Sequence, residues 1–335
     1  MSNDTVFAST KAGELTAFHV SDPNAIWSSV WIFPAGNDKE KPKAIYGTPV
    51  VTSDTVYFGA YDNKVYALDR SNGRPRWDAP FETHDPIIGA VILDPASNTL
   101  FAASEDGIVY GLDPATGRLK PSWRFDTGSQ IWASPLLENG ILYVPVMNGK
   151  LFAVEASTAH PIWAEPFKAS AGLISKPVLA DGKLLVGGID RKLYAINSST
   201  GRAAWSQPLV ADNWFWAEPL VAGGVVYAPS LDDRVYAVNL SDGSAAWPQP
   251  FKASDPIRAR PIIAGGTLVV VDRAGIVFGL DPADGTMKWP APANLTEQVF
   301  ADLVMLGERI LISAHGGALF TVDPATGAFN PVVTR

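Results

Sequence analysis

The sequence predicts an all-β fold, an eight-bladed β-propeller of four-stranded antiparallel blades. Three observations lead there. A unit of about 42 residues repeats along the 335-residue chain, each unit holds four short apolar runs, and the third run recurs eight times. Short runs rich in Val, Ile, Leu and Tyr between turn residues are typical of strands rather than helices. One such sheet cannot bury both of its faces, but blades stacked around an axis can, so eight copies imply eight blades.

Three markers set the register of the repeat. The third strand ends at His19 in the first unit and then at Asp69, Asp113, Glu155, Asn197, Asn239, Asp281 and Asp323. A tryptophan closes the first seven units, at Trp27, Trp77, Trp123, Trp163, Trp205, Trp247 and Trp289, and Pro331 stands at this place in the last unit. A proline opens the units at Pro49, Pro135, Pro177, Pro219 and Pro261. We therefore expect a single domain, 1–335, with units at approximately 1–34, 45–80, 87–126, 131–166, 173–208, 215–250, 257–292 and 299–335.

The links between strands have turn chemistry. The third-to-fourth link reads DPATG at 113–117 and 323–327, where proline suits an early turn position and glycine supplies a positive φ. The second-to-third links are hairpin turns that contain aspartate. We interpret these aspartates as turn formers rather than calcium ligands; they are Asp62, Asp106, Asp190, Asp232 and Asp233.

The two ends of the chain bear on how the propeller closes. The first unit starts at its second strand, so one strand is missing or supplied unusually. The tail at 330–333, NPVV, resembles the opening TPVV at 48–51. The tail is therefore either the fourth strand of the last blade or the innermost strand of the first. In both cases the N- and C-terminal segments lie side by side and close the ring.

Composition excludes several classes of function. The chain has no cysteine, which excludes disulfides, Cys-ligated metal sites and thiol nucleophiles. A net charge of −8 without a basic run argues against nucleic acid as a partner. No apolar stretch is long enough for a transmembrane helix, and MSNDTVFAST has no features of a signal peptide. The four histidines lack metal-ligand spacing, and no nucleophile elbow, phosphate loop or dinucleotide fingerprint occurs.

The repeat resembles that of a known family. The pattern V-Y-x-G-x-x-D-x-x-x-Y-A-L-D-x-x-x-G-x-x-x-W, read at 56–77, is similar to the repeat of pyrroloquinoline-quinone (PQQ) quinoproteins and is closest to their non-catalytic BamB-like relatives. The resemblance implies that each closing tryptophan packs between blades near a turn glycine, here Gly73, Gly117, Gly201, Gly243 and Gly285. The enzymes of this family are much longer and many carry a cysteine pair at the cofactor. We therefore expect no enzyme, no cofactor and no metal, with PQQ and calcium only under an alternative.

The residues that lead into each innermost strand predict the binding site. Since strand residues alternate faces, small residues two before the proline column pack between blades, and the residues one and three before it face the axis. This places a set of aromatic and charged residues around the funnel mouth: Tyr46, Trp132, Trp216, Arg258, Phe300, Lys176, Glu218, Arg260 and Asp302. We expect the pairs Lys176–Glu218 and Arg260–Asp302. A self-neutralised, water-filled channel remains the alternative to a binding site.

These residues favour a non-enzymatic scaffold that binds a protein or peptide partner through the loop face around the funnel. Trp132, Trp216 and Arg258 are the expected anchors. Two alternatives stay open: a small-molecule or quinone-binding protein or dehydrogenase, and the sensor domain of a longer receptor or kinase. The resemblance implies a periplasmic or cell-surface location, often with a lipid anchor, whereas the missing leader fits a cytoplasmic one. We expect a monomer.

Overall fold

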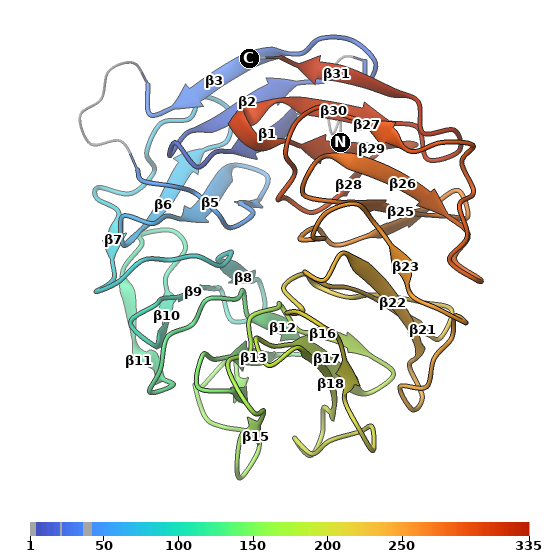
Figure 1. Ribbon diagram of the computed structural model, residues 1–335. Helices are drawn as coiled ribbons and strands as arrows, with labels where there is room; N and C mark the ends of the chain where they lie inside the picture. The colour runs from blue at the N-terminus through green and yellow to red at the C-terminus, as the bar shows by residue number, and fades with distance from the viewer. Residues whose placement is uncertain (1–4, 21, 36–41, 335) are drawn as a thin grey trace. The chain divides into compact units, whose positions relative to one another are not determined.

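The structure, a computed structural model, describes residues 5–20, 22–35 and 42–334. The fold is the predicted eight-bladed β-propeller: strands β1 to β31 form eight antiparallel sheets, each ordered as in the chain (Figure 1). The chain divides into two compact units. One comprises Met1–His19, Ser28–Pro177 and Ser199–Gly201, and the other comprises Val20–Trp27, Val178–Ser198 and Arg202–Arg335.

The first unit contains four sheets. In the described residues the first sheet has three strands, β1 (Thr5–Ser9), β2 (Leu15–His19) and β3 (Ser28–Phe33). The second has β4 (Val50–Val51), β5 (Thr55–Gly59), β6 (Lys64–Asp69) and β7 (Phe81–Glu82). The third has β8 (Ile92–Asp94), β9 (Thr99–Ala103), β10 (Ile108–Leu112) and β11 (Leu119–Asp126). The fourth has β12 (Leu136–Glu138), β13 (Ile141–Pro145), β14 (Lys150–Glu155) and β15 (Phe167–Lys168).

The second unit also contains four sheets. The first has β16 (Val178–Ala180), β17 (Lys183–Gly187), β18 (Lys192–Asn197) and β19 (Leu209–Val210). The second has β20 (Leu220–Ala222), β21 (Val225–Pro229), β22 (Arg234–Asn239) and β23 (Phe251–Lys252). The third has β24 (Ile262–Ala264), β25 (Thr267–Val271), β26 (Ile276–Leu280) and β27 (Ala293–Asn294). The last has β28 (Val304–Leu306), β29 (Arg309–Ser313), the 3₁₀ turn η1 (His315–Gly317), β30 (Leu319–Val322) and β31 (Phe329–Val333).

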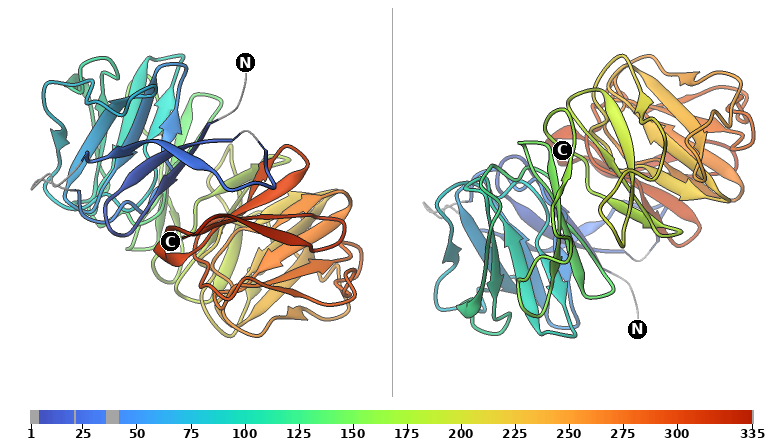
Figure 2. Two further views of the ribbon diagram at one scale, coloured as in Figure 1. Left: turned by 90° about the horizontal axis from the view of Figure 1, so that it is seen from above. Right: turned by 90° about the horizontal axis from the view of Figure 1, so that it is seen from below.

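The hydrophobic core lies between successive sheets of each unit, which face one another (Figure 2). One cluster joins Tyr57 and Trp77 of the second sheet to Leu100 and Leu112 of the third. Strands such as β5 and β9 are buried along their whole length because each sheet has neighbours on both faces. The repeat thus builds the core one interface at a time.

The repeated tryptophans pack between successive sheets and donate hydrogen bonds to the following one. Trp289 is 2% exposed and its Nε1 donates to Pro324 O at 3.0 Å in the third-to-fourth turn of the following sheet. A Cβ on Gly327 would lie 2.7 Å from the same indole, so this glycine allows close contact as well as a positive φ. The same donation or glycine contact recurs at Trp77, Trp123, Trp163, Trp205 and Trp247. The implied packing between blades is therefore confirmed for these residues.

The first blade departs from the predicted pattern. Trp31, not Trp27, occupies the packing position: its Nε1 donates to Arg70 O at 2.9 Å, and its ring lies against Gly73. Trp27 instead belongs to the second unit. The assignment of Trp27 to the repeat was wrong because the indole that packs here lies within β3, four residues further from the end of β2 than the repeat spacing predicts.

The C-terminal tail forms the fourth strand of the last sheet, which is the first of the two predicted arrangements. β31 pairs with β30, and Trp27 N donates to Val332 O at 2.7 Å. The segment Val20–Trp27 lies against this sheet, where Thr321 Oγ1 donates to Pro23 O at 2.7 Å. An N-terminal and a C-terminal segment are thus in contact, as predicted. In the described residues β1 pairs only with β2, so the innermost strand is the one that the first blade lacks.

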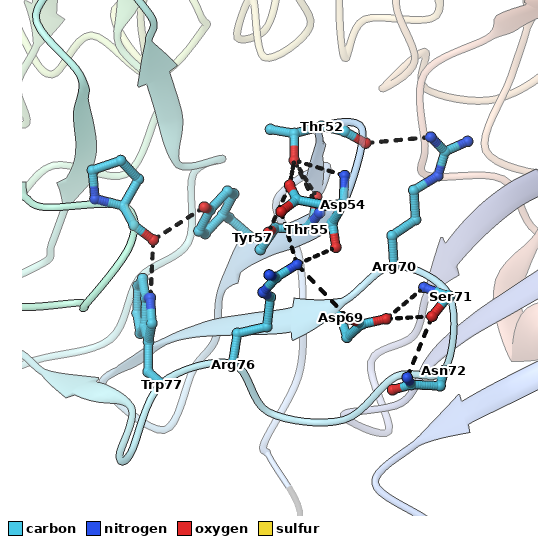
Figure 3. A network of polar contacts seen from close by, with 11 residues as sticks. Thr52, Asp54, Thr55, Tyr57, Asp69, Arg70, Ser71, Asn72, Arg76 and Trp77 are labelled. Carbon is cyan, nitrogen blue, oxygen red and sulfur yellow. Dashed lines mark hydrogen bonds and ion pairs between the residues drawn. The ribbon is translucent and has the colours of Figure 1, made fainter. Parts of the chain in front are cut away.

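Networks of polar side chains stabilise the turns between strands, as the second sheet shows. In Figure 3, Arg76 Nη1 lies 2.9 Å from one carboxylate, Asp54 Oδ2, and 3.7 Å from another, Asp69 Oδ2. The hydroxyls of Thr52 and Thr55 also donate to Asp54, and these bonds lower the pKa of its carboxyl group. The turn aspartates and threonines therefore fix the local backbone, which is the structural role that their residue types predict.

A tyrosine–aspartate pair explains the D-x-x-x-Y part of the repeat. Tyr236 Oη donates to Asp232 Oδ2 at 2.6 Å, and the same carboxylate accepts from the backbone nitrogen of Asp212 at 2.9 Å. Equivalent tyrosine bonds are made to the turn aspartates Asp62, Asp106 and Asp190. Asp106, Asp190 and Asp232 also accept from the backbone nitrogen two residues on, which supports the interpretation of these aspartates as turn formers.

We predict that Tyr236→Phe lowers the free energy of unfolding by about 1–2 kcal/mol, because a nearly buried carboxylate loses a charge-assisted hydrogen bond. Burial, followed by the bond to Asp232, raises the pKa of Tyr236. The folded-state pKa lies above the value of about 10 for an unfolded tyrosine. The stabilisation by this hydroxyl is therefore complete below pH about 10 and declines progressively as the pH rises above that value. Urea unfolding from pH 7 to 11 measures both effects. Equal stability of variant and wild type at pH 7 would contradict the prediction.

Candidate functional site: an aromatic and arginine cluster on the loop face

Backbone hydrogen bonds join two sets of loops that lie at the same end of the strands. In the second unit, Leu231 N donates to Trp214 O at 2.9 Å and Arg273 N donates to Pro256 O at 2.8 Å. Each bond joins a second-to-third turn to the loop that leads into the innermost strand of the same sheet. His315 N makes the corresponding bond to Gln298 O at 2.7 Å. The predicted loop face is thus formed by these two loop sets.

Arg258 is the centre of the cluster in the second unit. Its guanidinium carbon lies 4.3 Å from the ring centroid of Trp216 and 5.5 Å from that of Phe300. All three residues stand four positions before an innermost strand, at β24, β20 and β28 respectively. Cation–π contact of this kind favours a fixed guanidinium. Three residues predicted from one column of the repeat are therefore in contact.

Burial alternates along the segment that leads into each innermost strand, and this alternation separates these side chains from the core. Ile257 is fully buried and Ala259 is 2% exposed, whereas Arg258 between them is half-buried. Phe215 and Ala217 flank Trp216 in the same way. The small residues of the neighbouring column take the space between blades, and the larger ones project away from it.

A second layer of charge lies two residues further along each chain segment. Arg260 Nη1 is 3.6 Å from Glu218 Oε1, and the backbone nitrogen of Arg260 donates to Asp302 Oδ1 at 2.7 Å. Arg260 and Asp302 are therefore bonded, but through the backbone and not as the expected ion pair. The guanidinium pairs with Glu218 instead, because the carboxylate of the following blade reaches the backbone of the preceding one. The Lys176–Glu218 pair stays a prediction.

The other three predicted residues belong to the first unit. Tyr46 is 49% exposed and makes an edge contact with Tyr61, at 5.8 Å between ring centroids. Trp132 is half-buried, and among the described residues its Nε1 has no hydrogen-bond partner. Lys176 is half-buried as well. The structure therefore gathers six of the nine residues in the second unit and places these three in the first.

Sequence reasoning missed the contribution of the second-to-third turns. Arg273 forms a two-point ion pair with Asp255, at 2.9 Å from Nε to Oδ2 and 3.0 Å from Nη2 to Oδ1. His315 makes an edge contact with Phe300 at 5.9 Å. Both residues start their turns at the 42-residue spacing, so the same column analysis applied to the turns would have found them.

The electrostatics of the cluster centre on Arg258. Burial, and next the positive charge of Arg273, lower the pKa of the Arg258 guanidinium, which nevertheless stays protonated at neutral pH. Within residues 5–20, 22–35 and 42–334, no carboxylate pairs with it. The site therefore presents a fixed positive charge between two aromatic rings.

The PQQ alternative would bring a calcium ion with it. In the described part of the chain, no three His, Asp or Glu side chains are gathered as metal ligands. The turn aspartate Asp232 bonds to a tyrosine hydroxyl and a backbone nitrogen.

The sequence also matches a known protein family. The family profile described as outer membrane protein assembly factor BamB matches residues 1–120, 64–169 and 105–334, which cover nearly the whole chain. The chain belongs to the BamB family. The resemblance to BamB-like propellers is thus confirmed.

Individual proteins of known sequence or structure are also similar to this chain. A BamB from Xanthomonas campestris pv. campestris is 30% identical over 73 residues, which is 22% of this chain and 18% of that protein. The crystal structure of BamB from Moraxella catarrhalis has a TM-score of 0.75 at 20% identity, covering 95% of this chain and 90% of that one. The computationally designed Ika8 protein has a TM-score of 0.76 at 13% identity, with 95% and 93% covered. These two structures confirm the fold.

Among the residues that the structure describes, no helix is long and apolar enough to cross a membrane.

Proposed function

We propose that this chain is a non-enzymatic scaffold that binds a protein partner in outer-membrane protein assembly, through the loop face that carries Arg258. Membership of the BamB family supports the biological setting, since the family is described as outer membrane protein assembly factors. The same membership favours a periplasmic location next to the outer membrane.

The stacking of Arg258 on Trp216 and Phe300 is the observation that carries the proposal. Aromatic residues and arginine are the side chains that most often dominate the binding energy of protein interfaces. Most of the repeat is committed to blade packing, whereas these three residues project from it. A rigid scaffold that holds them in place reduces the entropy lost on binding.

The experiment compares the double variant Trp216→Ala, Arg258→Ala with the wild type in capture from a cell-envelope extract, after chemical crosslinking and mass spectrometry. We expect that a protein retained by the wild type is lost from the variant, while the two melting temperatures agree. The control Arg118→Ala, Ile162→Ala removes an exposed arginine and an exposed apolar residue from the third-to-fourth links.

Two results would contradict the proposal. Equal capture by the double variant and the wild type would show that another surface binds. A rise in melting temperature with PQQ and calcium that the double variant abolishes would favour a small-molecule site instead.

A further inference from the structure

Arg258 differs from the other arginines around it in having no acidic partner. Arg234 lies 2.7 Å from Asp212, Arg260 lies 3.6 Å from Glu218, and Arg273 forms the two-point pair with Asp255. In the described residues Arg258 makes cation–π contacts with the rings of Trp216 and Phe300 and forms no ion pair. One positive charge in this cluster is therefore left without compensation.

The nearby carboxylates are committed elsewhere. Glu218 pairs with the Arg260 guanidinium, and Asp302 accepts from the Arg260 backbone nitrogen. Asp255 receives both donors of Arg273. None of these acids neutralises Arg258, although the chain as a whole carries more acidic than basic residues, 34 against 26.

The two rings prepare Arg258 for a particular ligand. Contact between a guanidinium and aromatic faces holds the planar group and leaves its edge N–H donors free to act. Those donors match the two oxygens of a carboxylate, and partial burial strengthens the pairing relative to one in open water. Because the guanidinium is already held, less side-chain entropy is lost when the pair forms.

We propose that Arg258 is a carboxylate-binding subsite that receives an aspartate or glutamate side chain of the partner; this inference rests on the proposed function. The apolar stem of that side chain packs against Trp216 and Phe300. A chain terminus or a phosphate is a poorer fit, since such groups are usually held by additional backbone N–H donors. Here the nearby N–H of Arg260 is already bound to Asp302.

Defined peptides test the subsite. The probe is the pentapeptide Gly-Leu-Glu-Leu-Gly with blocked ends, and the comparison peptides replace Glu with Gln or carry Gln with a free terminal carboxylate. Calorimetric titration of the wild type at low salt should show the Glu peptide binding about tenfold more tightly than the Gln peptide, as a charge-assisted pair predicts. High salt should reduce this preference.

Substitutions at Arg258 distinguish the effect of its charge from the effect of its contacts with the aromatic rings. Arg258→Gln should remove the preference for the Glu peptide, Arg258→Lys should keep part of it, and Arg118→Gln should leave it unchanged. Binding of neither peptide, equal binding of the Glu and Gln peptides, or a preference for the free terminus would overturn the proposal.

The outcome is distinguishable from failure of the proposed function. If Arg258→Gln still captures the partner while Trp216→Ala loses it, the face is the interface but the carboxylate subsite is wrong. If neither substitution reduces capture, the proposed function itself fails.

Discussion

Trp289→Ala should lower the free energy of unfolding by about 3–5 kcal/mol, the largest loss that we expect from a single substitution in this chain. The indole is 2% exposed and belongs to the core between the last two sheets. Its removal leaves a cavity between Gly279 and Gly327, neither of which has a side chain to fill it, and deprives Pro324 O of the indole N–H bond. Urea unfolding followed by circular dichroism measures the loss.

Trp214→Ala is the matched control for this experiment. Trp214 is 38% exposed in a loop of the same unit, so its truncation removes little buried surface. We expect a change of less than about 1 kcal/mol. Comparable losses in the two variants would show that the repeated tryptophans do not carry the packing between blades.

Gly47→Val should cost about 2–3 kcal/mol for the opposite reason, because it overfills a contact between blades. A Cβ at Gly47 would lie 2.5 Å from Gly89 O and 2.7 Å from Ala90 N. Both are backbone atoms of the next sheet and cannot move aside as a flexible side chain would. The φ of Gly47 is not in the left-handed region, so the cost is steric.

The control for Gly47 comes from the same column of the repeat. Ala301 stands at the equivalent position before β28 but is exposed, so Ala301→Val places its extra atoms in solvent. Thermal and urea unfolding should show a clear loss for Gly47→Val and almost none for Ala301→Val. An unchanged midpoint for Gly47→Val would mean that the blades can separate to admit the side chain.

Much of the fold was predictable because each blade makes the same contacts with its neighbours. The positions of Trp77, Trp205 and Trp289 follow from a spacing that the chain repeats, and so do the turn aspartates. The prediction failed at Trp27 and Trp31, where the first unit is longer and a fixed spacing no longer identifies the packing residue.

The candidate site was predictable as a set of positions and not as a set of bonds. The columns before the innermost strands identify Trp216, Arg258 and Phe300 as residues that leave the core. They do not predict that the Arg260 guanidinium pairs with Glu218 while the Arg260 backbone nitrogen donates to Asp302. Side-chain partners depend on the rotamers and loop heights of adjacent blades, which a repeat alignment does not contain.

By itself the sequence determined the all-β architecture and the number of blades, since both depend on periodicity. It also identified Trp216, Arg258 and Phe300 as residues that leave the core of the second unit. Only the tertiary structure decided that the tail forms β31 in the last sheet, that Trp31 packs on Gly73, and that Arg258 forms no ion pair within the described residues. The physical reason is that such contacts join segments distant in the chain. Their energies depend on positions in space, which local propensities do not fix.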